Sequence, residues 1–172
     1  MRRHIPAGRR PRHGPVRTIV SGGQTGVDRA ALDVAFALGL PCGGWCPRGR
    51  RAEDGAIDTR YPLTETPLAT YLQRTMWNVR DSDATLVLLR GGPSGGTRAT
   101  IRLARRRGQR CRIVVMGPNP RPGPVAGWLS AARVRVLNVA GPRESESPGI
   151  YRTAFIFLQA VLKAPPTNRS SR

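Results

Sequence analysis

Two glycine-rich segments, each placed between an expected strand and an expected helix, have residue types suited to holding a phosphate. The first is Ser21-Gly-Gly-Gln-Thr-Gly-Val-Asp28, and the second is Gly91-Gly-Pro-Ser-Gly-Gly-Thr97. Glycine lets a backbone approach a phosphate closely, and the first N–H groups of a helix are unpaired and carry partial positive charge. Both segments also hold hydroxyl donors: Ser21, Thr25, Ser94 and Thr97.

Either segment alone could be a tight strand-to-helix turn that needs glycine for its backbone and threonine as a cap. Two such turns in one parallel sheet can face a shared crevice, because ligands bind at the carboxyl ends of the strands. We therefore expect both segments to grip one anionic ligand from neighbouring strands. Neither is followed by the lysine of a P-loop, and neither is a dinucleotide-binding G-x-G-x-x-G with an acid about 20 residues on.

Charged residues near these segments extend the candidate site. Asp28 would accept a hydrogen bond from a ribose hydroxyl or a purine-like ring, or would serve as a first-turn anion for the helix dipole. Arg29 could reach a phosphate or lie on the surface. Residues 40–65 are rich in Pro, Gly and charge and predict a long loop. This loop could close Arg48, Arg50 and Arg51 over a phosphate as a lid, or be a solvated loop. Its Trp45 could stack on a flat ring or be a core anchor, and we favour the anchor.

The hydrophobic pattern predicts an α/β protein. Apolar runs indicate strands, and apolar residues three or four apart indicate helices. The expected strands are 16–21, 84–89, 112–116 and 134–139, and we expect 84–89 and 112–116 to be buried. The expected helices are 25–38, a second opening at Thr66-Pro67, 97–107, 125–133 and 150–161. The second helix should bury a stripe of Leu68, Leu72, Met76 and Val79. Alternation of this kind predicts a Rossmann-like parallel sheet with helices on both faces, in a single three-layer domain.

Composition bounds the classes of protein that fit. The 172 residues suit one domain, which we place at 16–164 between a basic arm (1–15) and a tail (165–172), both expected to be disordered. No apolar run is long enough for a membrane span, and the N-terminus lacks the apolar core of a secretory signal, so a cytoplasmic protein is expected. Three cysteines without zinc-site spacing predict no metal site.

The formal net charge is +19, and 28 of the 29 cations are arginine. Six arginines lie in residues 1–17, and the body from residue 18 to residue 164 has a net charge of +11. Such an excess favours anionic partners, nucleic acid included. A general drift of lysine to arginine is the alternative explanation.

Five blocks give the chain a family resemblance: SGGQTGVDRAALDVA, GGWCPRGRRAEDGAI, RYPLTET, QRTMWNVRDSDATLVL and GGTRATIRLA. In this order they resemble the molybdenum carrier family, a circularly permuted, YpsA-like branch of the SLOG superfamily. Its Rossmann-like relatives include the Lonely-Guy phosphoribohydrolases and the DNA-processing protein DprA. The resemblance runs from about Ile19 to Leu162.

The resemblance implies a phosphorylated, nucleotide-like ligand between the two glycine-rich segments, with the molybdenum cofactor, a pterin carrying a phosphate, as one cargo. It also implies a homo-oligomer, and it places Glu53, Asn78, Asp81 and Asp83 in family blocks. The predicted ligand- and phosphate-binding residues are Gly22, Gly23, Gln24, Thr25, Gly26, Asp28, Arg29, Arg48, Asp54, Gly91, Gly92, Ser94, Gly95, Gly96 and Thr97.

Two alternatives remain open. Lonely-Guy enzymes follow their phosphate loop with a catalytic glutamate, but here Thr97 is followed by Arg98-Ala-Thr-Ile-Arg102 without an acid. A carboxylate for glycoside hydrolysis would have to come from elsewhere, so we favour binding over catalysis. The run Arg105-Arg-Arg107 with Arg110 and Arg112 could bind nucleic acid, although no aromatic residue is interleaved to stack on bases. Asp81 and Asp83 precede a strand and are expected to form turns.

Overall fold

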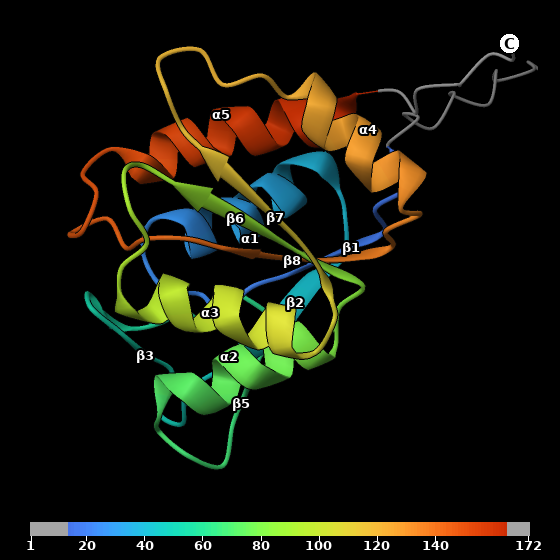
Figure 1. The fold of residues 1–172 in the computed structure, drawn as a ribbon. Coiled ribbons are helices and arrows are strands. Elements are labelled where there is room, and N and C mark those ends of the chain that lie inside the picture. The colour runs from blue at the N-terminus through green and yellow to red at the C-terminus, as the bar shows by residue number, and fades with distance from the viewer. Residues whose placement is uncertain (1–13, 165–172) are drawn as a thin grey trace, which may run out of the picture.

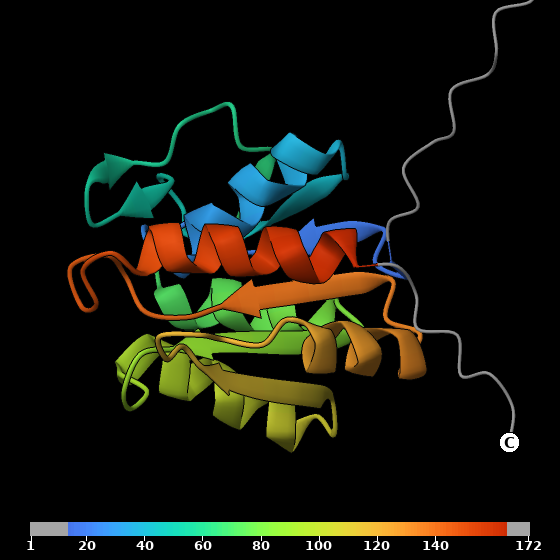
Figure 2. The same cartoon turned by 90° about the horizontal axis from the view of Figure 1, so that it is seen from above.

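The computed structural model describes residues 14–164, which fold around a six-stranded sheet in the order β5-β2-β1-β8-β6-β7 (Figures 1 and 2). Every neighbouring pair in this sheet is parallel. The strands are β1 (Thr18–Val20), β2 (Cys42–Cys46), β5 (Leu63–Glu65), β6 (Ala84–Leu89), β7 (Arg110–Val115) and β8 (Val136–Ala140). A small antiparallel hairpin joins β3 (Arg51–Ala52) to β4 (Gly55–Ala56). Nearly all of the predicted basic arm, and the whole predicted tail, lie outside the described residues.

Five helices cover the sheet on both faces. They are α1 (Val27–Leu38), α2 (Tyr71–Arg80), α3 (Gly95–Arg106), α4 (Gly123–Ala131) and α5 (Ile150–Lys163). Figure 1 shows α1, α4 and α5 on one side of the sheet and α2 and α3 on the other. The predicted Rossmann-like α/β architecture of three layers in one domain is therefore confirmed.

The core lies on both faces of β6, all six residues of which are buried. Leu86 and Leu88 pack into the large cluster beneath α1, α4 and α5, while Val87 and Leu89 face Ile101 of α3. An unbroken apolar run is typical of a parallel strand with helices on both sides, as the sequence predicted for this segment. The stripe predicted for the final helix is also buried, from Ile150 to Val161.

The prediction of one long loop at residues 40–65 is wrong, because the segment holds β2, β5 and the β3–β4 hairpin. Its strands escaped notice because β2 reads Cys-Gly-Gly-Trp-Cys and lacks the β-branched residues typical of strands. Gly44 is required there, since a β-carbon would come within 2.3 Å of the Ser21 carbonyl oxygen. The backbone of Ser21 comes so close to β2 that glycine is needed there, and glycine is not a residue type typical of strands.

The second helix also differs from its prediction. It begins at Tyr71 rather than at Thr66-Pro67, and Leu68 and Leu72 are each 52% exposed. Met76 is exposed as well, and only Val79 of the predicted stripe is buried. The face of α2 toward the sheet carries Thr75 and Asn78, because their side chains form hydrogen bonds with backbone groups. The apolar period therefore marked the outer face of the helix.

Two expectations about strand position are corrected by the sheet order. The strand predicted at 112–116 as buried is the edge strand β7, where Val115 is 63% exposed. The strands before the two glycine-rich segments, β1 and β6, are not neighbours, because β8 lies between them. The turn after β8 consequently stands between the two segments at the carboxyl edge of the sheet.

Candidate functional site

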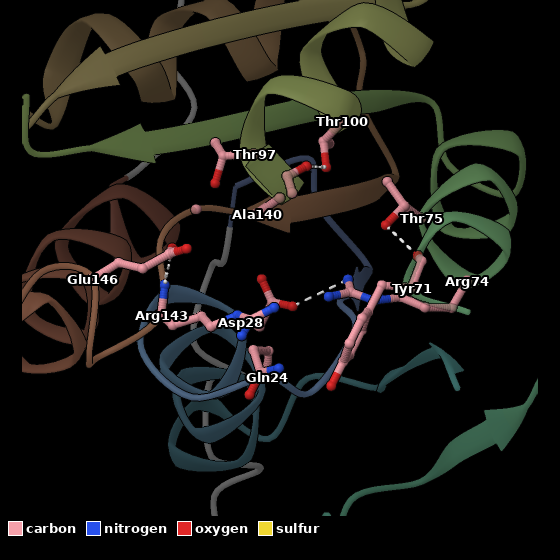
Figure 3. A pocket seen from close by; sticks show the side chains of 12 residues that line it. Gln24, Asp28, Tyr71, Arg74, Thr75, Thr97, Thr100, Ala140, Arg143 and Glu146 are labelled. Atoms are coloured by element: carbon pink, nitrogen blue, oxygen red, sulfur yellow. Dashed lines mark hydrogen bonds and ion pairs between the residues drawn. The ribbon is translucent and has the colours of Figure 1, made fainter. Parts of the chain in front are cut away.

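A cleft opens at the carboxyl ends of β1, β8 and β6, between the turns that follow these strands, with α2 as a side wall. Figure 3 shows Asp28 and Arg74 at its centre, Thr97 and Thr100 on one wall, and Gln24 and Tyr71 on the opposite one. Its volume is about 50 Å³, room for a few waters or one phosphate-sized group. It is lined by Gln24, Asp28, Tyr71, Arg74, Thr75, Gly96, Thr97, Thr100, Ala140, Gly141, Arg143 and Glu146.

A buried ion pair forms the floor of the cleft. Arg74 Nη1 donates to Asp28 Oδ2 at 3.2 Å, and the Asp28 side chain is 4% exposed. Burial raises the pKa of Asp28, while Arg74 and the backbone N–H groups of Gln24 and Gly22 favour its charged form. Two backbone N–H groups of the first glycine-rich segment thus act on the protein's own carboxylate.

Internal packing explains the glycines of this first segment. A β-carbon on Gly22 would lie 1.9 Å from Arg74 Nη1. Gly26 has a φ of 74°, and a β-carbon there would lie 2.4 Å from the Pro142 carbonyl oxygen. These glycines therefore let a guanidinium and the turn after β8 approach the backbone.

Gln24 brings an unpaired donor to the cleft. Its Oε1 accepts hydrogen bonds from the N–H groups of Thr25 at 3.1 Å and Glu53 at 2.9 Å. Because both partners are donors, the orientation of the amide is fixed, and Nε2 must be the remaining end. Nε2 is buried and has no acceptor among the described residues. A buried donor left unpaired costs about 1–3 kcal/mol, so it calls for a partner that enters the cleft.

The second glycine-rich segment forms the N-terminus of α3 and is open. A β-carbon built on Gly92, Gly95 or Gly96 would have no atom within 4 Å except those of adjacent residues and of the helix's own backbone. These glycines therefore have no internal packing role of the kind found in the first segment. Thr97 is buried beside them and lines the cleft. The first N–H groups of α3 point out of the helix end, as in anion sites.

The turn after β8 adds a second cation and a second carboxylate. The Arg143 guanidinium carbon lies 5.3 Å from the centre of the Tyr71 ring. Glu146 Oε2 accepts from the backbone N–H of Arg143 at 3.1 Å and from Ser94 Oγ at 3.0 Å. Glu146 thus joins this turn to the second glycine-rich segment across the mouth of the cleft.

Several predicted site residues lie outside the lining and bind one another. Thr25 Oγ1 donates to Glu53, which also accepts from Ser145 Oγ. Arg29 forms an ion pair with Asp54, which holds the β3–β4 hairpin beside the first segment. These contacts leave Gln24, Asp28, Gly96 and Thr97 as the predicted residues that line the cleft.

The predicted lid residues divide in the same way. Arg48 is exposed and does not line the cleft. Arg50 donates to four carbonyl oxygens of its own loop, which belong to Ile57, Asp58, Tyr61 and Leu63. Arg50 therefore serves the folding of the loop.

The remaining family-block residues have structural partners. Trp45 is half-buried and packs edge-on against Trp77, with ring centres 4.5 Å apart. Asn78 binds both backbone groups of Trp45, at 2.7 Å and 3.0 Å. Asp81 accepts from the Trp45 indole, and Asp83 accepts from the backbone N–H groups of Arg135 and Val136, at the start of β8. Both aspartates thus have the structural role expected of them.

Sequence reasoning missed the lining residues that come from α2 and from the turn after β8: Tyr71, Arg74, Thr75, Thr100, Ala140, Gly141, Arg143 and Glu146. One signal was available, because the expected strand at 134–139 is followed by Gly141 in the same strand-then-glycine pattern as the two segments. Arg74 and Thr75 lie in the family block QRTMWNVRDSDATLVL, but no hydrophobic pattern marked them as lining residues, because the apolar stripe of α2 is exposed.

Among residues 14–164, no group of three or more His, Cys, Asp or Glu side chains is placed to hold a metal ion. No helix in the same range has the length and apolar character needed to cross a membrane.

A parallel sheet with helices on both faces and a cleft at its carboxyl edge defines an α/β protein of Rossmann-like fold. Residues 19–162 match the circularly permutated YpsA SLOG family, and the chain belongs to this family. It is also similar to a protein from Syntrophus aciditrophicus SB whose 1.45 Å crystal structure is described as that of a "putative molybdenum carrier protein". The two chains are 38% identical, with 87% of this chain and 97% of that chain covered and a TM-score of 0.82. No curated protein matches the chain.

Proposed function

We propose that the protein binds a phosphorylated, nucleotide-like small molecule in this cleft and carries it unchanged. One observation carries the proposal: Gln24 lines the cleft, and its buried Nε2 has no acceptor among the described residues. A phosphate oxygen, ring nitrogen or carbonyl oxygen of a ligand would complete it.

The phosphate belongs at the second glycine-rich segment. The first segment directs its N–H groups at Asp28, whose negative charge would oppose a second anion there. The N-terminus of α3 at Gly95, Gly96 and Thr97 is open and opposite Arg74 and Arg143. A cleft of about 50 Å³ takes the phosphate end alone, so the ring of the ligand lies at the mouth beside Tyr71.

The relative from Syntrophus suggests a molybdenum-related cargo. We extend this suggestion to a pterin that carries both a phosphate and the metal. The described residues offer no cluster of metal ligands, so the protein would hold the organic part and leave the metal to the pterin.

A second candidate function is hydrolysis of a nucleotide to free base and ribose phosphate. Glu146 favours it, because this carboxylate lies 3.0 Å from Ser94, beside the open end of α3. Glu146 also clamps the turn after β8, however, and that role explains its position without a reaction.

Calorimetric titration with inorganic phosphate, AMP and molybdopterin tests the proposal. We expect binding tighter than millimolar to a phosphorylated compound, weakened at least about tenfold in Gln24→Glu, because this change replaces a donor with a charged acceptor. Gln159→Glu on α5 is the matched control and should bind normally. Absence of binding to every phosphorylated compound would refute the proposal, and release of free adenine from AMP would favour the hydrolase.

A further inference from the structure

The positive charge of the folded body comes from one continuous stretch. Residues 84–143 contain twelve arginines and no acidic residue. The rest of residues 18–164 contains eight arginines, one lysine and ten acids, a net charge of −1. A drift from lysine to arginine would leave the balance of acids and bases unchanged along the chain, so drift does not explain this division.

The sheet order gathers this charge on one half of the molecule. Residues 84–143 form β6, α3, β7, α4 and β8, which make up one half of the sheet and its helices. None of the twelve arginines forms an ion pair with another residue of the described range 14–164. Seven lie on or next to α3 and β7. Five of these, on α3 or at its C-cap, form what we call the arginine face: Arg98, Arg102, Arg105, Arg106 and Arg107. All five are exposed.

A groove with an apolar floor runs beside this face, between α2 and the C-terminal end of α3. Its lining combines Met76, Trp77 and Leu103 with Arg80, Arg106 and Arg107, and its volume is about 260 Å³. The groove lies about 15 Å along α3 from Gly96, since a helix rises about 1.5 Å per residue. It is therefore separate from the cleft of the proposed function.

Tertiary structure also supplies an aromatic residue that the linear arginine run lacks, because Trp77 of α2 lines the groove together with Arg106 and Arg107. Arginines beside flat apolar surfaces are what single-stranded nucleic acids use, with phosphates on the cations and base faces on the apolar floor.

We propose that the arginine face and the α2–α3 groove bind single-stranded nucleic acid. A second copy of the chain does not fit, because two such faces would repel each other. An acidic protein segment would satisfy the arginines, but a flexible polyanion with flat bases matches both the charge and the apolar floor. Binding is independent of sequence, since the groove offers cations and apolar surface and few directional acceptors.

Fluorescence anisotropy of the full chain with a labelled oligothymidylate of about 15 nucleotides tests this inference. Binding should weaken steeply with salt. The double variant Arg106→Glu/Arg107→Glu should lower affinity at least about tenfold, and lower the salt slope by about 1.4, or about 0.7 for each lost phosphate contact. Arg106→Gln/Arg107→Gln should show a smaller loss in the same direction and avoids placing acids at a helix C-terminus.

The control is Arg51→Glu/Arg152→Glu, an equal change of charge at exposed positions outside residues 84–143 and outside the groove. It should keep most of the affinity, and so should Gln24→Glu in the cleft. An equal loss in control and groove variants would overturn the proposal, as would the absence of binding. Equal affinity for a duplex, or equal competition by polyglutamate of matched charge, would overturn it too.

Discussion

The guanidinium of Arg74 lies against the α-carbon of Gly22, so closely that a β-carbon there would be 1.9 Å from Nη1. The same nitrogen holds the buried Asp28 carboxylate. These three residues come from a turn and from two helices, α1 and α2, and they form one unit. The glycine of the first segment is thus explained by an internal ion pair, and this separates the roles of the two segments.

Gly22→Ala should destabilise the fold. The added methyl group must displace the Arg74 guanidinium from Asp28, and overpacking of this kind costs about 1–3 kcal/mol. Urea unfolding followed by circular dichroism measures the change. If the variant has the same urea midpoint as the wild type, Arg74 moves aside freely and the ion pair contributes little.

Gly96→Ala should have the opposite effect on stability. No atom stands within 4 Å of the new β-carbon, and alanine favours a helix over glycine by up to about 1 kcal/mol. The methyl group would nevertheless occupy the space proposed for the phosphate, so AMP should bind about tenfold more weakly. A variant that is both more stable and fully able to bind would place the phosphate elsewhere. Thermal unfolding and calorimetry provide the two measurements.

Arg74→Met should leave the Asp28 carboxylate buried without its cation, which costs about 3 kcal/mol. Adding Asp28→Asn should recover most of this loss. The pKa of Asp28 is already raised by burial, and loss of Arg74 raises it further. The folded variant then gains a proton before the unfolded chain does, so its deficit should be full at neutral pH and shrink as the pH falls through the folded pKa. A deficit independent of pH would exclude this cause.

Glu53→Gln should loosen the β3–β4 hairpin and change how the stability of the fold depends on pH in the acid range. Burial opposes ionisation of Glu53, but hydrogen bonds from Ser145 and Thr25 lower its pKa below the ordinary 4.5. The wild type therefore gains stability from Glu53 above about pH 4.5 and loses it as the pH falls through the lower folded value. In the variant, the melting temperature should change less over this acid range. If the melting temperatures of the two proteins change equally over this acid range, Glu53 does not cause the loss of stability.

Sequence patterns predicted the fold where one physical signal dominated. The apolar run Ala84–Leu89 could only be a strand covered on both faces, and the period of α5 was equally plain. The patterns failed where a tertiary contact replaced the usual residue type. β2 carries glycines because it passes close to Ser21, and α2 presents Asn78 to β2 while its leucines face outward.

The candidate site was predictable only in part for a similar reason. Glycine-rich turns are local signals, so Gln24, Asp28, Gly96 and Thr97 were found. Arg74 and Arg143 reach the cleft from segments about 50 to 120 residues from the first turn, and nothing local distinguishes them from other arginines. Asp28 is buried against the first segment, and no sequence pattern shows which side chains become buried in this way.

The position of β8 has a consequence for how the chain reaches its native state. β8 lies between β1 and β6 and pairs with both, yet it is the last strand in sequence among residues 14–164. Until it is synthesised, the sheet exists as two unconnected halves, each with an unpaired inner edge. Folding must therefore be completed late and through contacts distant in sequence, which slows folding and exposes strand edges to aggregation. A ribosome-bound chain that ends before residue 136 should be protease-sensitive throughout.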